Sequence, residues 1–218
     1  MRPSARYNKV EVTTIGVLAL QGDFAEHQAV LRRLGVDAPQ VRTPDGLRGL
    51  DGLIIPGGES TTFCRLMQDF NLYEPLRAVT RAGLPVWGTC AGLIVLAQRV
   101  SDLEFPTLEA LDITARRNAF GRQVDSFQAD VSISALTEAS RPFHAVFIRA
   151  PVVDDTGAGV EVLASLPEGS GPAAGSPSAV RQGPLLATSF HPELTDDDRF
   201  HGYFLELVRQ QGRRSSPK

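Results

Sequence analysis

The stretch Gly88–Leu93 (GTCAGL) carries one of only two cysteines in the chain, Cys90, between two glycines and directly after the apolar run LPVW. A G-x-C-x-G pattern between a strand and a helix is the cysteine counterpart of the G-x-S-x-G nucleophile elbow. In that turn a side chain at Gly88 or Gly92 would clash with nearby backbone, and the positive end of the following helix would favour a thiolate. On these residues alone, a small buried cysteine in a tight turn is the alternative.

A second candidate is the SFHPEL stretch, Ser189–Leu194. Of the four histidines, only His191 follows a predicted strand and precedes a carboxylate, Glu193, by two positions. Pro192 favours an extended conformation at His191, and residues i and i+2 of an extended segment point the same way. With the elbow, this pattern predicts a Cys90–His191–Glu193 triad in which the carboxylate orients the imidazole and stabilises its charged form. An isolated H-P-E is otherwise a surface turn.

The third candidate is IPGGES, Ile55–Ser60, which also ends an apolar strand. An oxyanion hole needs backbone N–H donors, one from the residue after the nucleophile and one from a neighbouring loop. We expect Ala91 and Gly58 to supply them. The alternative is a helix-capping turn with Ser60 or Thr61 as the N-cap, and both interpretations can hold together.

These motifs need elements that bring several strand ends together. Apolar runs predict strands at 15–20, 38–42, 51–58, 84–88 and 184–190, and helical spacing predicts helices at 24–35, 60–70, 72–83, 91–100 and 196–211. Such alternation predicts an α/β fold with a mainly parallel central sheet and helices on both faces, a flavodoxin-like three-layer arrangement. Its ligand site should lie at the carboxyl ends of the strands.

The second half of the chain shows a different pattern. Strand-like pieces at 111–117, 126–133, 145–151 and 159–165 have few helical residues between them, and they either extend the sheet or form an antiparallel flap. The segment 167–183 is rich in Gly, Pro and Ser and is predicted to be an exposed loop, with a long hairpin connection as one form that it could take. We expect one folded domain over 14–211, with tails at 1–13 and 212–218.

Composition limits the function classes. The chain has 218 residues, is 42% hydrophobic and has a formal charge of −3, which gives no reason to expect nucleic acid or a membrane as partner. The polar N-terminal residues lack an apolar signal core, so we expect a cytoplasmic protein with reduced thiols. Cys64 falls in a helical pattern and is expected to pack, and His144 is expected to be structural. No zinc spacing or nucleotide-binding glycine motif occurs, so no metal or cofactor is expected.

In this order, GTCAG, PGGES and HPE resemble class I, triad-type glutamine amidotransferase domains. The segments LALQGD, PGGESTT and RNAFGRQVDSF are more specifically similar to the glutaminase subunit of pyridoxal 5′-phosphate synthase. The resemblance covers about Ile15 to Val208, nearly the whole predicted domain.

The resemblance implies that Cys90 attacks the side-chain amide of L-glutamine, that His191 protonates the departing ammonia, and that Glu193 orients His191. It also implies a set of substrate-binding residues: Gly57, Gly58, Glu59, Arg117, Ile148 and Arg149. The ammonia would pass to a separate (β/α)8-barrel synthase subunit that makes pyridoxal 5′-phosphate, the active form of vitamin B6. Gln21 would couple the site to that partner, its alternative being a plain turn residue.

The chain departs from the family pattern in its N-terminal extension and in a long 167–184 stretch, either of which would affect docking rather than chemistry. Two other functions stay open from the residues. A cysteine peptidase, or a glutaminase of another pathway, would keep the triad. A non-enzymatic glutamine-binding subunit would be expected to lack Cys90 or His191, and this chain has both.

Overall fold

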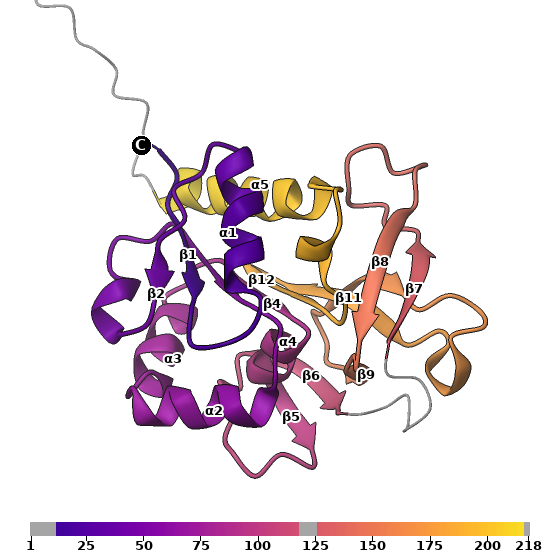
Figure 1. Cartoon of the computed structure of the whole chain (residues 1–218), viewed down its shortest axis with the longest axis horizontal. Helices are drawn as coiled ribbons and strands as arrows, with labels where there is room; N and C mark the ends of the chain where they lie inside the picture. Colours follow the sequence, from indigo (N-terminus) through magenta and orange to yellow (C-terminus); the bar gives the residue numbers. More distant parts are fainter. Residues whose placement is uncertain (1–11, 118–125, 216–218) are drawn as a thin grey trace, which may run out of the picture.

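The centre of the protein is a mixed sheet. The computed structural model describes residues 12–117 and 126–215, and within them the largest sheet has seven strands in the order β10-β11-β12-β4-β3-β1-β2 (Figure 1). Its strands are β1 (Ile15–Leu18), β2 (Gln40–Val41), β3 (Gly52–Ile55), β4 (Val86–Thr89), β10 (Glu161–Ser165), β11 (Pro177–Gln182) and β12 (Leu185–Thr188). The pairs from β2 to β12 are parallel, and β11 and β10 add antiparallel strands at one edge.

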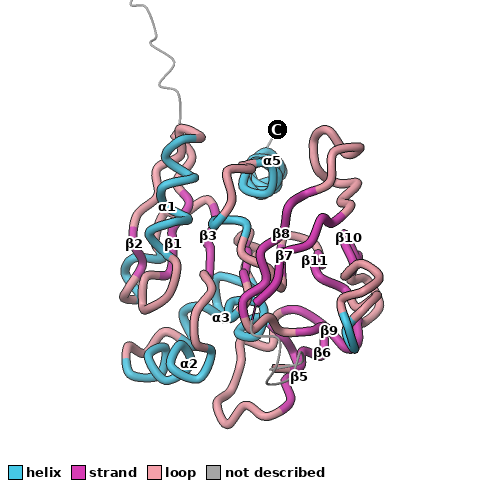
Figure 2. The backbone as a smooth tube through the Cα atoms, turned by 45° about the vertical axis from the view of Figure 1, so that its right-hand side comes forward, coloured by secondary structure: helices cyan, strands magenta, loops and turns pink. Residues whose placement is uncertain are grey.

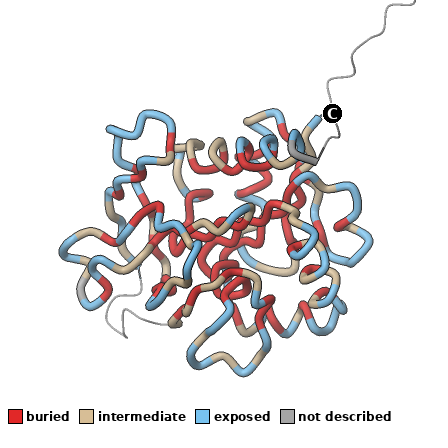
Figure 3. The backbone as a smooth tube through the Cα atoms, turned by 180° about the vertical axis from the view of Figure 1, so that it is seen from behind, coloured by how far each residue is buried: buried red, intermediate tan, exposed pale blue. Residues whose placement is uncertain are grey.

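Helices cover both faces of this sheet (Figure 2). They are α1 (Phe24–Arg33), α2 (Ser60–Asp69), α3 (Tyr73–Arg81), α4 (Ala91–Leu96) and α5 (Arg199–Ser215). Side chains alternate along a strand, so β3 sends Ile54 to the face under α1 and α5 and its neighbours Leu53 and Ile55 to the face under α2, α3 and α4. The buried residues accordingly form two clusters, and they run through the middle of the molecule in Figure 3.

The remaining strands form two small sheets beside the main one. One contains β5 (Ala97–Ser101), β6 (Leu111–Arg116) and β9 (Val152–Thr156), and the other is the antiparallel pair β7 (Ser126–Val131) and β8 (Phe143–Ile148). Short 3-10 turns complete the chain as η1 (Pro44–Leu47), η2 (Gly171–Ala173) and η3 (Pro192–Leu194). Both alternatives for the strand-rich second half therefore occur. Strand β10 extends the main sheet, whereas β6, β7, β8 and β9 belong to the two small sheets, one of which is an antiparallel pair.

The predicted fold class is confirmed, but the helix predicted over 91–100 is too long. The structure ends α4 at Leu96 and begins β5 at Ala97, whose backbone is extended (φ −60°, ψ 144°). From there the chain pairs in parallel with β6, between Ala97 and Leu111 and again from Arg99 to Ser101. The sheet ladder satisfies backbone groups that a longer helix would otherwise satisfy, and no local signal in the sequence shows this.

The prediction of an exposed loop over 167–183 is wrong for its second half. Residues Pro177–Gln182 form β11, in which Ser178, Ala179 and Val180 are fully buried between β10 and β12. Proline is tolerated at the first position of a strand, so its presence did not exclude this pairing. The predicted tail boundary after residue 211 also falls inside α5, which continues to Ser215. Residues 1–11 lie outside the described part of the chain.

Candidate active site

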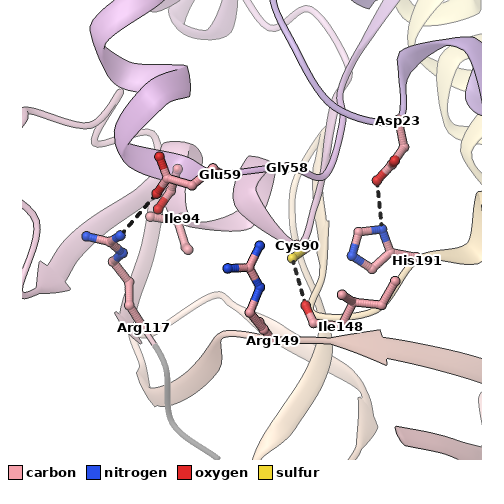
Figure 4. A pocket seen from close by; sticks show the side chains of 10 residues that line it. Asp23, Gly58, Glu59, Cys90, Ile94, Arg117, Ile148, Arg149 and His191 are labelled. Atoms are coloured by element: carbon pink, nitrogen blue, oxygen red, sulfur yellow. Dashed lines mark hydrogen bonds and ion pairs between the residues drawn. The ribbon is translucent and has the colours of Figure 1, made fainter. Parts of the chain in front are cut away.

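The carboxyl ends of β1, β3, β4 and β12 meet at one edge of the sheet, because these strands are parallel. The segments that follow them surround a pocket of about 250 Å³ (Figure 4). Its lining residues are Asp23, Gly58, Glu59, Ser60, Cys90, Ile94, Arg117, Ile148, Arg149 and His191. Three motifs separated in sequence therefore contribute to one pocket, together with Arg117 after β6 and the end of β8.

Cys90 occupies a sharp turn between β4 and α4. Its φ of 48° is left-handed, which costs a non-glycine residue of order 1–3 kcal/mol. The surrounding structure holds it there, since its N–H donates to the carbonyl of Thr188 at 2.8 Å. A Cβ at Gly88 would collide with the backbone of Gly92, and a Cβ at Gly92 with the carbonyl of Ile55. The two glycines are thus required by close packing of the turn, as the sequence predicted.

The sulfur of Cys90 faces the pocket, although the residue is only 6% exposed. Its thiol donates to the carbonyl of Ile148 at 3.7 Å, which joins the elbow to the end of β8 (Figure 4). The imidazole of His191 lines the same pocket, and its Nε2 is buried without a hydrogen-bond partner among the described residues. That nitrogen is therefore free to exchange a proton with the thiol or a substrate.

The other ring nitrogen of His191 is held by two carboxylates. Nδ1 lies 2.8 Å from Oε1 of Glu193 and 3.3 Å from Oδ2 of Asp23. Burial lowers the pKa of His191, but its interactions with Asp23, Cys90 and Glu193 outweigh burial and raise that pKa to about 12. The site therefore stabilises the imidazolium, the form that an acid catalyst needs before it gives up a proton.

Glu193 lies in the 3-10 turn η3 and is fully buried at its side chain. Burial raises the pKa of its carboxyl, and the hydrogen bond with His191 opposes that shift. The proline between the two residues places His191 at φ −108° and ψ 84°, outside the helical region. The two side chains meet as predicted, but across a 3-10 turn and not within the extended segment on which the prediction was based.

The loop after β3 packs directly against His191. A Cβ at Gly57 would overlap the Cε1 atom of the imidazole, so only glycine fits there without moving the ring. Gly58 follows with a φ of 147°, and the side chain of Gln21 braces the next residue. Gln21 Nε2 donates to the carbonyl of Glu59 at 3.2 Å, and Glu59 N–H donates to Gln21 Oε1 at 3.3 Å.

Glu59 is the N-cap of α2, which corrects the prediction of Ser60 or Thr61. Its carboxylate accepts the N–H groups of Thr61 at 3.0 Å and Thr62 at 2.7 Å, because an ionised side chain satisfies two free donors of the first turn where a hydroxyl satisfies one. Burial raises the pKa of Glu59, but these hydrogen bonds outweigh it and lower that pKa to about 2. An ionised carboxylate therefore lies at one end of the pocket.

Arg117 stands beside that carboxylate. Its Nη2 lies 3.4 Å from Oε1 of Glu59 (Figure 4). The same nitrogen donates to Oγ1 of Thr61 at 3.0 Å, and Nη1 donates to the carbonyl of Asp102 at 2.8 Å. Arg149 lines the pocket from the end of β8 and has a left-handed φ of 42°. The guanidinium groups of Arg117 and Arg149 and the carboxylate of Glu59 therefore border this end of the pocket.

A comparison with protein-family models gives one match that covers most of the chain. The model described as the SNO glutamine amidotransferase family matches residues 17–210. The chain belongs to this glutamine amidotransferase family. The resemblance seen in the sequence is therefore confirmed.

Relatives within the family cover nearly the same length. A protein of Kineococcus radiotolerans named pyridoxal 5′-phosphate synthase subunit PdxT is 56% identical over 200 residues, which is 91% of this chain and 96% of that protein. A protein of the same name from Acidothermus cellulolyticus is 56% identical over 201 residues, 91% and 95% of the two chains. A crystal structure titled glutamine amidotransferase has a TM-score of 0.80 and 49% identity, covering 89% of this chain and 98% of that one.

Four of the predicted site residues do not line the pocket themselves: Gln21, Gly57, Ala91 and Glu193. Gln21, Gly57 and Glu193 contact residues that line it, and Ala91 is the first residue of α4, next to Cys90. The segment RNAFGRQVDSF lies outside the described residues over 118–125. None of the described helices is both long and apolar enough to span a membrane.

Sequence reasoning missed Asp23, which reaches His191 from the loop after β1. The residue stands in the LALQGD segment, but only Gln21 was singled out there, since no local pattern pairs an aspartate with a distant histidine. Asp23, His191 and Glu193 also offer ligand atoms within 4.8 Å of one another, the arrangement of a potential metal site. Because Nδ1 of His191 is hydrogen-bonded to Glu193, a metal there would have to displace that proton.

Proposed function

We propose that this protein is the glutaminase subunit of a pyridoxal 5′-phosphate synthase and that Cys90, His191 and Glu193 are its catalytic triad. The observation that carries the proposal is the meeting of the strained elbow cysteine and the carboxylate-bound histidine in one pocket. Membership of the glutamine amidotransferase family and the names of its relatives support the same activity.

The raised pKa of His191 favours the imidazolium, so in this scheme the thiol proton of Cys90 already lies on Nε2 of His191 when glutamine binds, and the sulfur is a thiolate. The sulfur forms a bond with the side-chain amide carbon of glutamine, and the carbonyl π electrons move to oxygen. When the carbonyl forms again, the C–N bond breaks and His191 gives its proton to nitrogen, so that ammonia leaves and a glutamyl thioester remains. Water then attacks the thioester, His191 takes a proton from it, and the sulfur departs to yield glutamate.

Backbone donors stabilise the oxyanion in this scheme. We assign these donors to the N–H group of Gly58, which lines the pocket, and to that of Ala91, which follows Cys90 as the first residue of α4, by analogy with hydrolase elbows. Gln21 holds the loop that contains Gly58 in place, because its side chain forms hydrogen bonds with both the carbonyl and the N–H group of Glu59. A contact made by a partner near Gln21 would therefore reach the oxyanion hole, and we assign Gln21 the coupling role on that basis.

The charged end of the pocket suits a free amino acid. Glu59 offers an ionised acceptor for the α-ammonium group, and Arg117 and Arg149 offer donors for the α-carboxylate. Gly57 and Ile148 complete this binding set through the backbone, next to Gly58 and Arg149. A peptide lacks both charges at an internal residue, so this end of the pocket favours glutamine over a peptidase substrate.

We further propose that ammonia passes to a (β/α)8-barrel synthase subunit and that the complex works in the cytoplasm. No cofactor enters the glutaminase step, because the thiol, the imidazole and water supply every group that the reaction transfers.

The test is a glutaminase assay of Cys90→Ala with the synthase subunit present. Glutamate formation should disappear, because no other group forms the thioester, while synthesis of pyridoxal 5′-phosphate from added ammonium should continue. Glutamine-dependent synthesis at the wild-type rate in this variant would refute the assignment. Assaying the wild-type protein with and without the synthase subunit also tests the coupling.

A further inference from the structure

Two buried histidines stand behind the triad, and the scheme above does not use them. His27 lies on α1 and His201 on α5, two helices that pack on the same face of the sheet and cross each other (Figure 1). Both are completely buried, and Nδ1 of His27 lies 3.0 Å from Nε2 of His201 although the residues are 174 positions apart in the chain. Neither histidine lines the pocket.

The far side of His27 faces the triad. Its Nε2 lies 3.2 Å from Oγ1 of Thr89 and 3.3 Å from Oε2 of Glu193. Oε1 of Glu193 forms the hydrogen bond with His191, whereas Oε2 has no well-aligned hydrogen-bond partner among the described residues. His27 therefore presents the ring nitrogen that faces an otherwise unsatisfied, buried carboxylate oxygen.

Both histidines are neutral at ordinary pH. Burial lowers the pKa of His27 far below 6.5, with further lowering from His201 and His191, and burial lowers the pKa of His201 to about 3. Each ring consequently has one N–H and one lone pair, so the 3.0 Å contact requires one ring to donate and the other to accept.

The surroundings select one of the two arrangements. If His27 donated from Nδ1, its Nε2 lone pair would face the carboxylate of Glu193, and the proton of His201 would sit on Nδ1, which is buried without a partner among the described residues. An orphaned buried N–H is rare and costly, whereas an unpaired lone pair is tolerated more readily. The favoured arrangement has His201 donating from Nε2 to His27, so that Nε2 of His27 carries the proton toward Thr89 and Glu193.

We propose that His27 is a positioning residue of the glutaminase reaction: its Nε2–H, held in that tautomer by His201, keeps Glu193 ionised and aimed at His191. The proposal rests on the triad assigned above. The aromatic ring of Trp87 packs edge-on against both histidines, with centroid distances of 5.6 Å to His27 and 4.9 Å to His201, and limits the rotation of either ring.

A positioning role predicts a change in kcat without a matching change in KM. Among the described residues, the polar and ring contacts of the His27 side chain are outside the charged end of the pocket; they are with Thr89, Trp87, Glu193 and His201. Its loss should therefore leave the KM for glutamine within about twofold. The 3.3 Å contact between Nε2 of His27 and Oε2 of Glu193 is weaker than a well-aligned hydrogen bond, so the kcat should fall about tenfold, the lower end of the effect of losing a hydrogen bond to a charged group. A purely structural role would lower the melting temperature and leave the kcat of the folded protein unchanged.

The test compares two amide variants in the complex with the synthase subunit, with glutamate formation as the readout. His27→Gln places an amide near the position of Nε2 and keeps a donor toward Glu193. His27→Asn places the amide near Nδ1, so it faces His201 and leaves Glu193 without a donor. We expect His27→Gln to keep kcat within about threefold of wild type and His27→Asn to lose about tenfold.

The matched control is Leu76→Ala, a change at a fully buried residue of α3, in the core cluster on the face of the sheet opposite to α1 and α5. It should lower the melting temperature without changing kcat by more than about twofold. Equal kcat values for the Gln and Asn variants, or a larger loss in His27→Gln, would overturn the proposal. A wild-type complex without glutaminase activity would instead overturn the function itself, so the two failures are distinguishable.

Discussion

Replacing Glu193 with glutamine isolates the charge of the triad carboxylate, because the side chains have nearly the same shape. In the wild-type protein Oε1 of Glu193 accepts the Nδ1–H of His191 at 2.8 Å, and the side chain is fully buried. A hydrogen bond to a charged group contributes about 1.5–3 kcal/mol. Each 1.36 kcal/mol changes a rate about tenfold, so complete loss in the transition state would lower kcat by about 10- to 150-fold.

Asp23 determines how large the loss of kcat should be in Glu193→Gln. Its Oδ2 lies 3.3 Å from the same Nδ1, so a second carboxylate still balances the imidazolium when Glu193 is neutralised. We therefore expect Glu193→Gln to lose about tenfold in kcat, the lower end of the range. The double variant Glu193→Gln/Asp23→Asn should lose more than the product of the two single losses, since residues that share a partner are not additive.

The assay is glutamate formation at saturating glutamine in the complex with the synthase subunit, with ammonium-dependent synthesis as an internal check on the partner. Glu206→Gln is a suitable control, because Glu206 is exposed on α5 and pairs only with Arg209 among the contacts described for it. Wild-type kcat in Glu193→Gln, with an unchanged melting temperature, would remove Glu193 from the triad and refute the reasoning.

Two further predictions follow from packing and from burial. Gly57→Ala should reduce kcat at least tenfold, because its Cβ would overlap the ring of His191, and a glutaminase assay showing wild-type turnover would mean that the ring position is unimportant. The pKa of His201 is about 3 in the folded protein and near 6.5 when exposed, so the unfolded state binds more protons between these values. The free energy of unfolding should therefore fall by about 1.4 kcal/mol for each pH unit below 6.5, and His201→Gln should remove this part of the slope in urea unfolding between pH 7 and pH 5. An unchanged slope in that variant would show that His201 is protonated in the folded state.

Local chemistry made the central motifs readable without coordinates. The turn at Cys90 depends on two glycines within two residues of it, and the meeting of His191 and Glu193 depends on the proline between them. The parallel sheet follows from alternating apolar runs and helical patterns, and it brings the strand ends to one edge. Arg117 and Arg149 were found only through the resemblance to the family.

Errors arose where distant pairing outweighed local preference. The chain leaves the helical conformation after Leu96 because β6 offers a ladder partner, and the glycine- and serine-rich segment becomes β11 because β10 and β12 enclose it. The N-cap of α2 is Glu59 for a similar reason, since Gln21 and Arg117 hold that residue in place from other parts of the chain.

The sequence by itself thus determined the layered α/β fold, the nucleophile elbow and the histidine–carboxylate pair, since each depends on sterics and dihedral preferences within a few residues. Only the tertiary structure decided what surrounds the triad: the second carboxylate of Asp23 and the neutral His27–His201 pair behind Glu193. A hydrogen-bond partner in a buried site is chosen by which side chains the packed elements bring within about 3 Å, and no local pattern contains that information.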